Sequence, residues 1–115
     1  ERRVRVDPQG RYAHTIVTVL QRYPDYTLID AEILTGRTHQ IRVHLKSIGH
    51  TIVGDEKYGD DELRKKLVQQ GFKRMFLHAS KLRFPHPISA EWMTVEAELP
   101  PACEQLLKRI AAHEF

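Results

Sequence analysis

The sequence predicts an α+β fold, with a mixed, mostly antiparallel sheet and flanking helices. Two observations carry this prediction. Segments rich in β-branched, aromatic or alternating apolar residues, with proline-containing turns between paired segments, occur at residues 14–23, 26–34, 75–84 and 91–99. Segments with the composition and apolar spacing of helices occur at residues 38–48, 60–70 and from Pro100 onward.

The predicted strands form two pairs. A Pro-Asp turn at residues 24–25 joins the first pair. Within residues 26–34, alternation places Ile29, Ala31 and Ile33 on one side, as in a half-buried strand. A Pro-His-Pro turn joins the second pair, which we therefore expect to form a hairpin.

The helix predicted at residues 38–48 has two distinct faces. Its buried stripe is predicted from apolar residues at i, i+4 and i+7, which are Ile41, Leu45 and Ile48. A second face at i, i+3 and i+7 carries His39, Arg42 and Lys46. The next helix, residues 60–70, begins with acidic residues and continues with basic ones, which suits the helix dipole, and Gly71 is its predicted end.

Composition sets only broad limits. A chain of 115 residues with a net charge of +3 is one domain or a piece of one. Its single cysteine, Cys103, excludes an intrachain disulfide, favours a reducing compartment such as the cytoplasm, and is predicted to be a small core residue. No apolar run approaches about 18 residues, so we expect no membrane span.

The most informative segment extends from Ile33 to Gly54, because it contains no carboxylate. It holds six basic or ionisable residues, which are Arg37, His39, Arg42, His44, Lys46 and His50. Exposed protein surfaces usually mix both signs of charge, so a segment of one sign this long indicates a phosphate-bearing partner. Gly36 precedes the helix and serves either a simple turn or an anion site at the helix amino terminus.

Arg42 has two interpretations from spacing alone. It is either a surface arginine on an exposed face, or a half-buried one, because it follows Ile41 and has no acidic residue at i±3 or i±4. A half-buried arginine finds a carboxylate elsewhere in the fold or meets a phosphate. The histidines do not indicate a metal site, since His39 and His44 are five residues apart and no carboxylate lies near them in sequence.

The chain also resembles a known family. The run Leu-Thr-Gly-Arg-Thr-His-Gln-Ile-Arg-Val-His-Leu at residues 34–45, with residues 49–55 and 58–59, resembles the third sequence motif of the RluA-type RNA pseudouridine synthases. Residues 76–79 and 84–87 resemble that family's next motif. The resemblance implies a pseudouridine synthase-like fold with a basic cleft and no cofactor or metal. It also implies an aspartate nucleophile acting on a flipped-out uridine.

The resemblance assigns roles to individual residues. It implies that Arg42 is the catalytic arginine, which pairs with the aspartate nucleophile. The implied substrate-binding residues are Arg37, His39, Ile41 and Leu77, with Leu77 forming an apolar floor under the base. Lys46 and His44 are predicted to bind RNA.

The family's nucleophile lies in a Gly-Arg-Leu-Asp motif, which these 115 residues do not contain. We expect this motif upstream of Glu1, so that residues 1–115 are the carboxyl-terminal half of a catalytic domain and cannot act alone. The expected partners are 23S-type rRNA and the missing amino-terminal half. The alternative is a non-catalytic RNA-binding module with the same basic surface.

Overall fold

The computed structural model describes residues 2–5, 14–34 and 39–114, and the predicted α+β class is confirmed. The chain divides into two compact units, residues 1–76 and 77–115. All strand pairs in the described residues are antiparallel, in one three-stranded and one two-stranded sheet. The predicted mostly antiparallel sheet is therefore present as two separate pieces.

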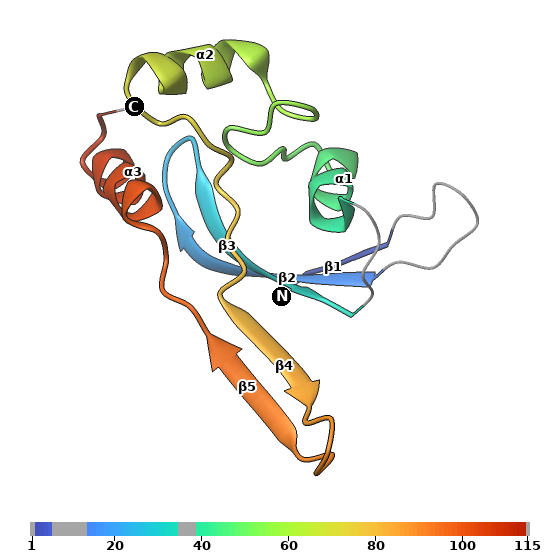
Figure 1. Cartoon of the computed structure of the whole chain (residues 1–115). Helices are drawn as coiled ribbons and strands as arrows, with labels where there is room; N and C mark the ends of the chain where they lie inside the picture. Colours follow the sequence, from blue (N-terminus) through green and yellow to red (C-terminus); the bar gives the residue numbers. More distant parts are fainter. Residues whose placement is uncertain (1, 6–13, 35–38, 115) are drawn as a thin grey trace. The chain divides into compact units, whose positions relative to one another are not determined.

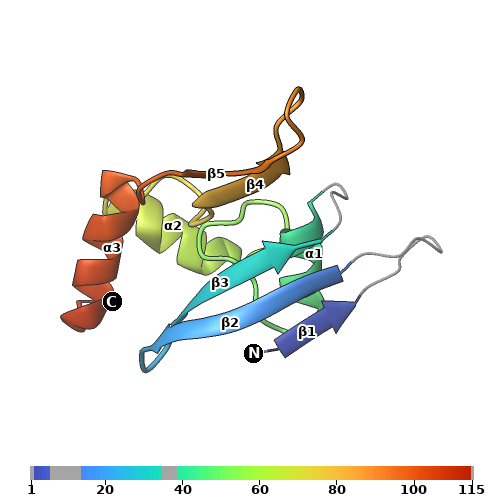
Figure 2. The ribbon, with the colours of Figure 1, turned by 90° about the horizontal axis from the view of Figure 1, so that it is seen from below.

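The first unit contains a three-stranded sheet with the order β1-β2-β3. Its strands are β1 (Arg2–Arg5), β2 (His14–Arg22) and β3 (Thr27–Ile33). Figure 1 and Figure 2 show β2 between the other two strands. The register of β2 on β3 shifts between Val19 and Gln21, where a bulge makes room for the exposed Leu20. The first predicted strand pair is confirmed.

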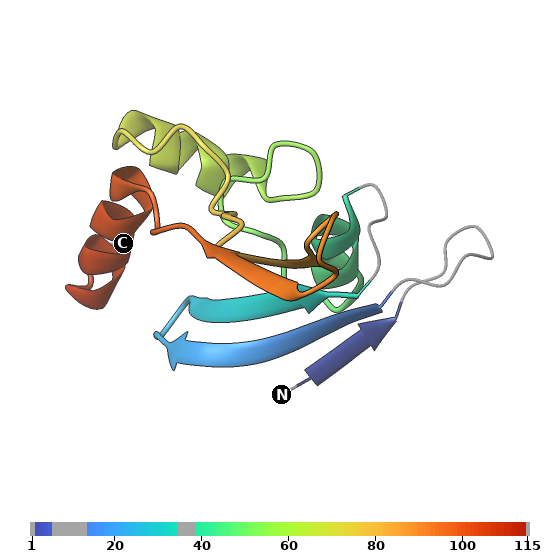
Figure 3. The same ribbon diagram turned by 60° about the horizontal axis from the view of Figure 1, so that its bottom comes forward.

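Helix α1 (Gln40–Ser47) packs on β2 and β3 of this sheet (Figure 3). Its buried residues are Gln40, His44 and Leu45. The predicted apolar stripe is therefore only partly right, because Ile41 and Ile48 are half-buried while two polar side chains lie beneath the helix. The helix begins after His39, which has left-handed backbone angles, with φ of 52°.

Hydrogen bonds explain how polar residues can be buried under α1. The Gln40 side chain donates to the carbonyl oxygen of His14 at 2.9 Å and to Thr15 Oγ1 at 3.0 Å. Thr15 Oγ1 also shares a hydrogen bond with His44 Nδ1 at 2.6 Å. Thr15 and His44 are 0% and 1% exposed, so this polar contact is sealed from water and fixes α1 on β2.

Helix α2 (Asp61–Gln69) follows a loop and matches the predicted segment. Asp60 caps it, because its carboxylate accepts hydrogen bonds from the backbone N–H groups of Glu62 and Leu63. Gly71 follows the helix with a φ of 96°, as a residue that ends a helix. Leu67 and Phe72 bring this region into the apolar core of the first unit.

The second unit contains a hairpin and a helix. Its elements are β4 (Lys81–Pro85), β5 (Trp92–Glu96) and α3 (Pro101–Ala111). The predicted hairpin and final helix are confirmed, and Cys103 is fully buried in α3, as predicted. The strand predicted over 75–84 is shorter, beginning at Lys81. One reason is that the Phe76 backbone N–H donates to the carbonyl oxygen of Val53 instead of to a partner strand.

Within the described residues, no helix is long and apolar enough to cross a membrane.

Replacing Thr15 with valine tests whether the buried hydrogen bonds hold α1 on β2. Thr15→Val keeps the shape of the side chain but removes its hydrogen bonds to Gln40 and His44. We expect the free energy of unfolding to fall by about 1–3 kcal/mol. Thr18→Val, on the same strand but half-buried, is the matched control and should change it by less than about 0.5 kcal/mol. Equal effects of both variants in chemical denaturation would contradict this role.

Candidate active site

The centre of the candidate site is an ion pair between Arg42 on α1 and Asp55 in the loop that follows. Arg42 Nε donates to Asp55 Oδ2 at 2.9 Å, and its terminal nitrogen donates to Oδ1 at 2.7 Å. The two side chains are 15% and 1% exposed. A two-point contact between a planar guanidinium and a carboxylate fixes the direction of both groups, which a single contact does not.

The local sequence explains why Asp55 faces Arg42. Its carboxylate also accepts the backbone N–H groups of Lys57 at 2.9 Å and Tyr58 at 3.0 Å, so the loop turns around it. Gly59 closes the turn, since its N–H donates to the Asp55 carbonyl oxygen at 3.1 Å. A Cβ at Gly59 would lie 2.4 Å from that oxygen, so the close approach requires glycine.

These contacts change the ionisation of both partners. The hydrogen bond from Arg42 holds the pKa of the Asp55 carboxyl far below its usual range, and the N–H groups of Tyr58 and Lys57 act in the same direction, while burial opposes them. The hydrogen bond to Asp55 raises the pKa of Arg42, again against the effect of burial. Because the folded-state pKa of Asp55 is lowered, its stabilising effect is complete above its unfolded pKa of about 3.9 and is lost as the pH falls through the folded pKa.

The basic side chains of this region contact the ring of Tyr58. Three cations lie over its ring, with Arg42, Lys46 and Lys57 at 5.2, 5.6 and 5.4 Å from the centroid. The His39 ring meets it edge-on at 5.8 Å, and His39 Nδ1 lies 3.2 Å from the tyrosine hydroxyl. The predicted shared face of His39, Arg42 and Lys46 is therefore confirmed, because all three side chains contact the Tyr58 ring.

Three predicted site residues are placed differently from this group. His44 was predicted to bind RNA, but it is 1% exposed and bonded to Thr15, so it cannot reach a ligand, and that prediction is wrong. Ile41 is half-buried. Leu77 is half-buried at the beginning of the second unit, and the predicted Arg37 lies outside the described residues.

The sequence interpretation missed Asp55 as the partner of Arg42. The resemblance assigned Arg42 only a partner expected upstream of Glu1, whereas in the structure Asp55 pairs with it across 13 positions in the chain. The available signal was the Gly-Asp-x-x-Tyr-Gly run at residues 54–59, whose two glycines and acidic residue indicate a tight turn around a carboxylate. The interpretation that Arg42 finds a carboxylate elsewhere in the fold is confirmed.

Asp55 is poorly suited to be a nucleophile. Its carboxylate is almost fully buried and accepts four hydrogen bonds, two from Arg42 and two from the backbone. A nucleophile must expose an oxygen to its substrate, and a carboxylate held this way is both inaccessible and weakly basic. Asp55 instead orients Arg42 and stabilises the loop at residues 54–59. Among the described residues, no cluster of three or more His, Cys, Asp or Glu could bind a metal.

Comparison with known proteins shows which family this chain resembles. Residues 1–47 match the family model for RNA pseudouridylate synthase. A solved structure titled "Human RNA Pseudouridylate Synthase Domain Containing 1" superposes with a TM-score of 0.58 and 30% identity, covering 91% of this chain and 50% of that one. The resemblance seen in the sequence is confirmed, and the chain is related to the RNA pseudouridine synthases.

Particular relatives match over nearly the whole chain. Ribosomal large subunit pseudouridine synthase C from Haemophilus ducreyi is 45% identical over 114 residues, which are 99% of this chain and 36% of that protein. The protein of the same name from Escherichia coli is 41% identical over 112 residues, 96% of this chain and 35% of that protein. The chain thus spans about a third of the length of the curated relatives it matches.

A double-mutant cycle measures the strength of the ion pair. Asp55→Ala should reduce the free energy of unfolding by about 3–5 kcal/mol, because it strands the Arg42 charge and removes the acceptor for two backbone N–H groups. Arg42→Gln should also destabilise, and the two losses should not add. Lys65→Gln, an exposed charge on α2, is the control. Additive losses in chemical denaturation would show that the pair does not couple the helix and the loop.

Proposed function

We propose that the protein containing this chain isomerises uridine to pseudouridine in large-subunit rRNA. The observation that carries the proposal is the match to ribosomal large subunit pseudouridine synthase C proteins over up to 99% of the chain. The oriented arginine and the cationic face around Tyr58 support it, because such a reaction needs an RNA-binding surface beside a charged site.

We infer a defined part for Arg42 in this reaction. Asp55 engages two of the five N–H donors that a guanidinium offers, and the side chain remains 15% exposed. The remaining donors are thus held in a fixed direction by a buried partner. In the proposed enzyme they pair with the carboxylate nucleophile in the assembled site, so that Asp55 acts as the residue that positions Arg42.

The nucleophile belongs, in this proposal, to the part of the relatives' length that the chain does not span. A carboxylate that attacks the uridine nucleotide lets the bond between the ribose and N1 of the base break in one step. The base then rotates, C5 bonds to the ribose as the carboxylate leaves, and the C5 proton is lost while N1 gains one from solvent. The uridine must leave its stack to be reached, which requires a pocket and nearby cations for the phosphates.

The exposed cations around Tyr58 are suited to the phosphates of that RNA. Lys46 and Lys57 are exposed, and their ammonium groups lie 5.6 and 5.4 Å from the centre of the Tyr58 ring. Cations arranged on an aromatic ring form a patch that attracts a phosphate without reading the base sequence. The predicted RNA-binding role of Lys46 is part of this proposal.

Arg42→Ala in the complete protein should lower the turnover number about 100-fold or more, because it removes the fixed charge beside the reacting carboxylate. A 100-fold loss corresponds to an increase of about 2.7 kcal/mol in the activation free energy. Tritium released from rRNA labelled at C5 of uridine measures the reaction. Arg42→Lys should recover only part of the loss, since a point charge does not reproduce two parallel hydrogen bonds. Arg22→Ala, an exposed arginine at the end of β2, is the matched control.

A structural loss must be separated from a chemical one, because Arg42→Ala strands the buried Asp55. The double variant Arg42→Gln with Asp55→Asn replaces the ion pair by a neutral pair of similar shape and should remain folded. It should still be inactive. Normal turnover in this double variant would show that Arg42 serves folding alone, and RNA binding without any tritium release by the unmodified protein would favour the non-catalytic RNA-binding module.

A further inference from the structure

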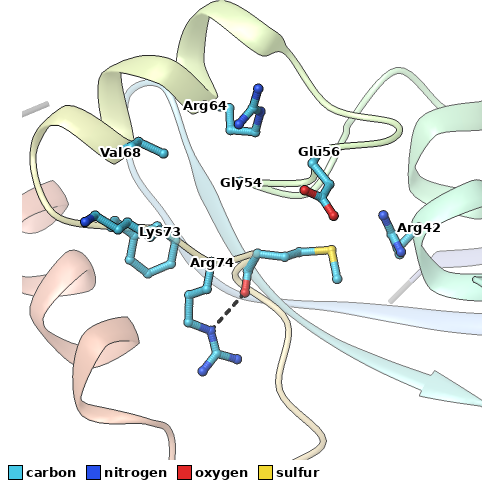
Figure 4. A pocket seen from close by; sticks show the side chains of 9 residues that line it. Arg42, Gly54, Glu56, Arg64, Val68, Lys73 and Arg74 are labelled. Atoms are coloured by element: carbon cyan, nitrogen blue, oxygen red, sulfur yellow. Dashed lines mark hydrogen bonds between the residues drawn. The ribbon is translucent and has the colours of Figure 1, made fainter.

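A second feature of the first unit lies beside Arg42 but plays no part in the proposed chemistry. It is a pocket of about 210 Å³ between the loop after α1, helix α2 and the segment that follows α2 (Figure 4). Pockets for drug-sized ligands measure about 300–1,000 Å³, so this one suits a phosphate group with its sugar better than a larger ligand. Its lining residues are Arg42, Gly54, Glu56, Arg64, Val68, Phe72, Lys73, Arg74 and Met75.

The charge of the lining favours an anion. Four lining side chains are cationic and one, Glu56, is acidic. Figure 4 shows Arg64 and Arg42 on different sides of the space, with Lys73 at its edge and the Lys73 nitrogen directed outward. Asp55 pairs with Arg42, and Asp61 lies 3.7 Å from Arg64, so the cations on the side formed by α2 and the residues after it are only partly offset. On that side Lys73 is exposed, so a ligand can reach its ammonium group from solvent.

Arg64 provides a more specific indication. Its Nε is buried and has no hydrogen-bond partner within the described part of the chain. Asp61 Oδ1 forms an exposed ion pair with it at 3.7 Å, a distance too long for a hydrogen bond. The Arg64 side chain as a whole is 36% exposed, so a phosphate in the pocket would accept from its terminal N–H groups while Nε stays buried.

The backbone around the pocket is held in place. Gly54 has a φ of 81°, and a Cβ there would lie 2.2 Å from the carbonyl oxygen of Arg74. The Phe76 N–H donates to the Val53 carbonyl oxygen at 2.8 Å. These contacts hold the Asp55 loop against the segment at residues 72–76. The backbone positions of Arg42 and Lys73, which line the same pocket, are therefore fixed relative to each other. The apolar side formed by Val68, Phe72 and Met75 gives a sugar a surface to pack on.

We propose that this pocket binds a backbone phosphate of the RNA next to the uridine that is modified, with Arg64 and Lys73 as its contacts. The proposal rests on the function proposed above, because Arg42 borders both the pocket and the candidate active site. A strand whose uridine lies at Arg42 would place a neighbouring phosphate within reach of Arg64. The pocket would then fix the path of the strand without reading its sequence.

The test is the salt dependence of RNA affinity in the complete protein, measured with an rRNA fragment. Arg64→Gln combined with Lys73→Gln should weaken binding about tenfold or more, as expected when hydrogen bonds to a charged group are lost. It should also make the slope of log affinity against log salt less steep by about 0.7, the value for one phosphate on a single strand. Lys65→Gln with Lys66→Gln removes the same charge from α2 outside the pocket and is the matched control, expected to keep the slope.

Other variants separate the possible outcomes. Arg64→Lys with Lys73→Arg keeps the charges and should keep the slope, and Lys73→Gln alone provides a milder change if the double variant unfolds. An unchanged slope in folded pocket variants would overturn the proposal. So would binding of inorganic phosphate that depends on Arg64 while RNA affinity is unaffected, since the pocket would then hold a free anion. The pocket is tested by RNA affinity, whereas the proposed function is tested by tritium release. A protein that binds RNA but releases no tritium would therefore refute the proposed function, and the affinity test of the pocket would still apply.

Discussion

The ion pair between Arg42 and Asp55 is the interaction on which the rest of the first unit's site depends. One partner stands on α1, which the buried Thr15–His44 hydrogen bond fixes on the sheet. The other forms the centre of the loop at residues 54–59. This two-point contact therefore fixes the loop that carries Tyr58 and Lys57 relative to α1, and α1 is itself fixed on the sheet.

The same ion pair reduces the net positive charge on this surface. Asp55 offsets the charge of Arg42 from its buried side, so that the guanidinium can remain oriented among several other cations. Lys46 and Lys57 are exposed and keep their charge available to a ligand. A long basic segment would otherwise repel itself, and one buried carboxylate reduces that repulsion without covering the outer face. This combination suits a protein that must hold a polyanion and direct one arginine at it.

The sequence predicted the regular elements well because their signals are local. Alternation identified β3, and an acidic cap with a terminal glycine identified α2. The site was predicted less completely, since its main contact joins residues 13 positions apart through a loop without periodicity. His44 shows a second limit: its spacing, three residues after Ile41, places it beside the apolar stripe, but the sequence does not show the hydrogen-bond partner on β2 that allows a histidine to be buried there. Such pairings depend on tertiary structure and leave little trace in spacing.

The most direct measurement of the central interaction is the titration of the Asp55 carboxyl carbon by NMR in the complete protein. If Arg42 holds this carboxylate as described, its signal should remain that of the ionised form well below the usual aspartate pKa of about 3.9. In Arg42→Gln the midpoint should move upward, because the largest stabilising contact of the carboxylate is gone. A midpoint near the usual value in the unmodified protein, unchanged by Arg42→Gln, would contradict the account.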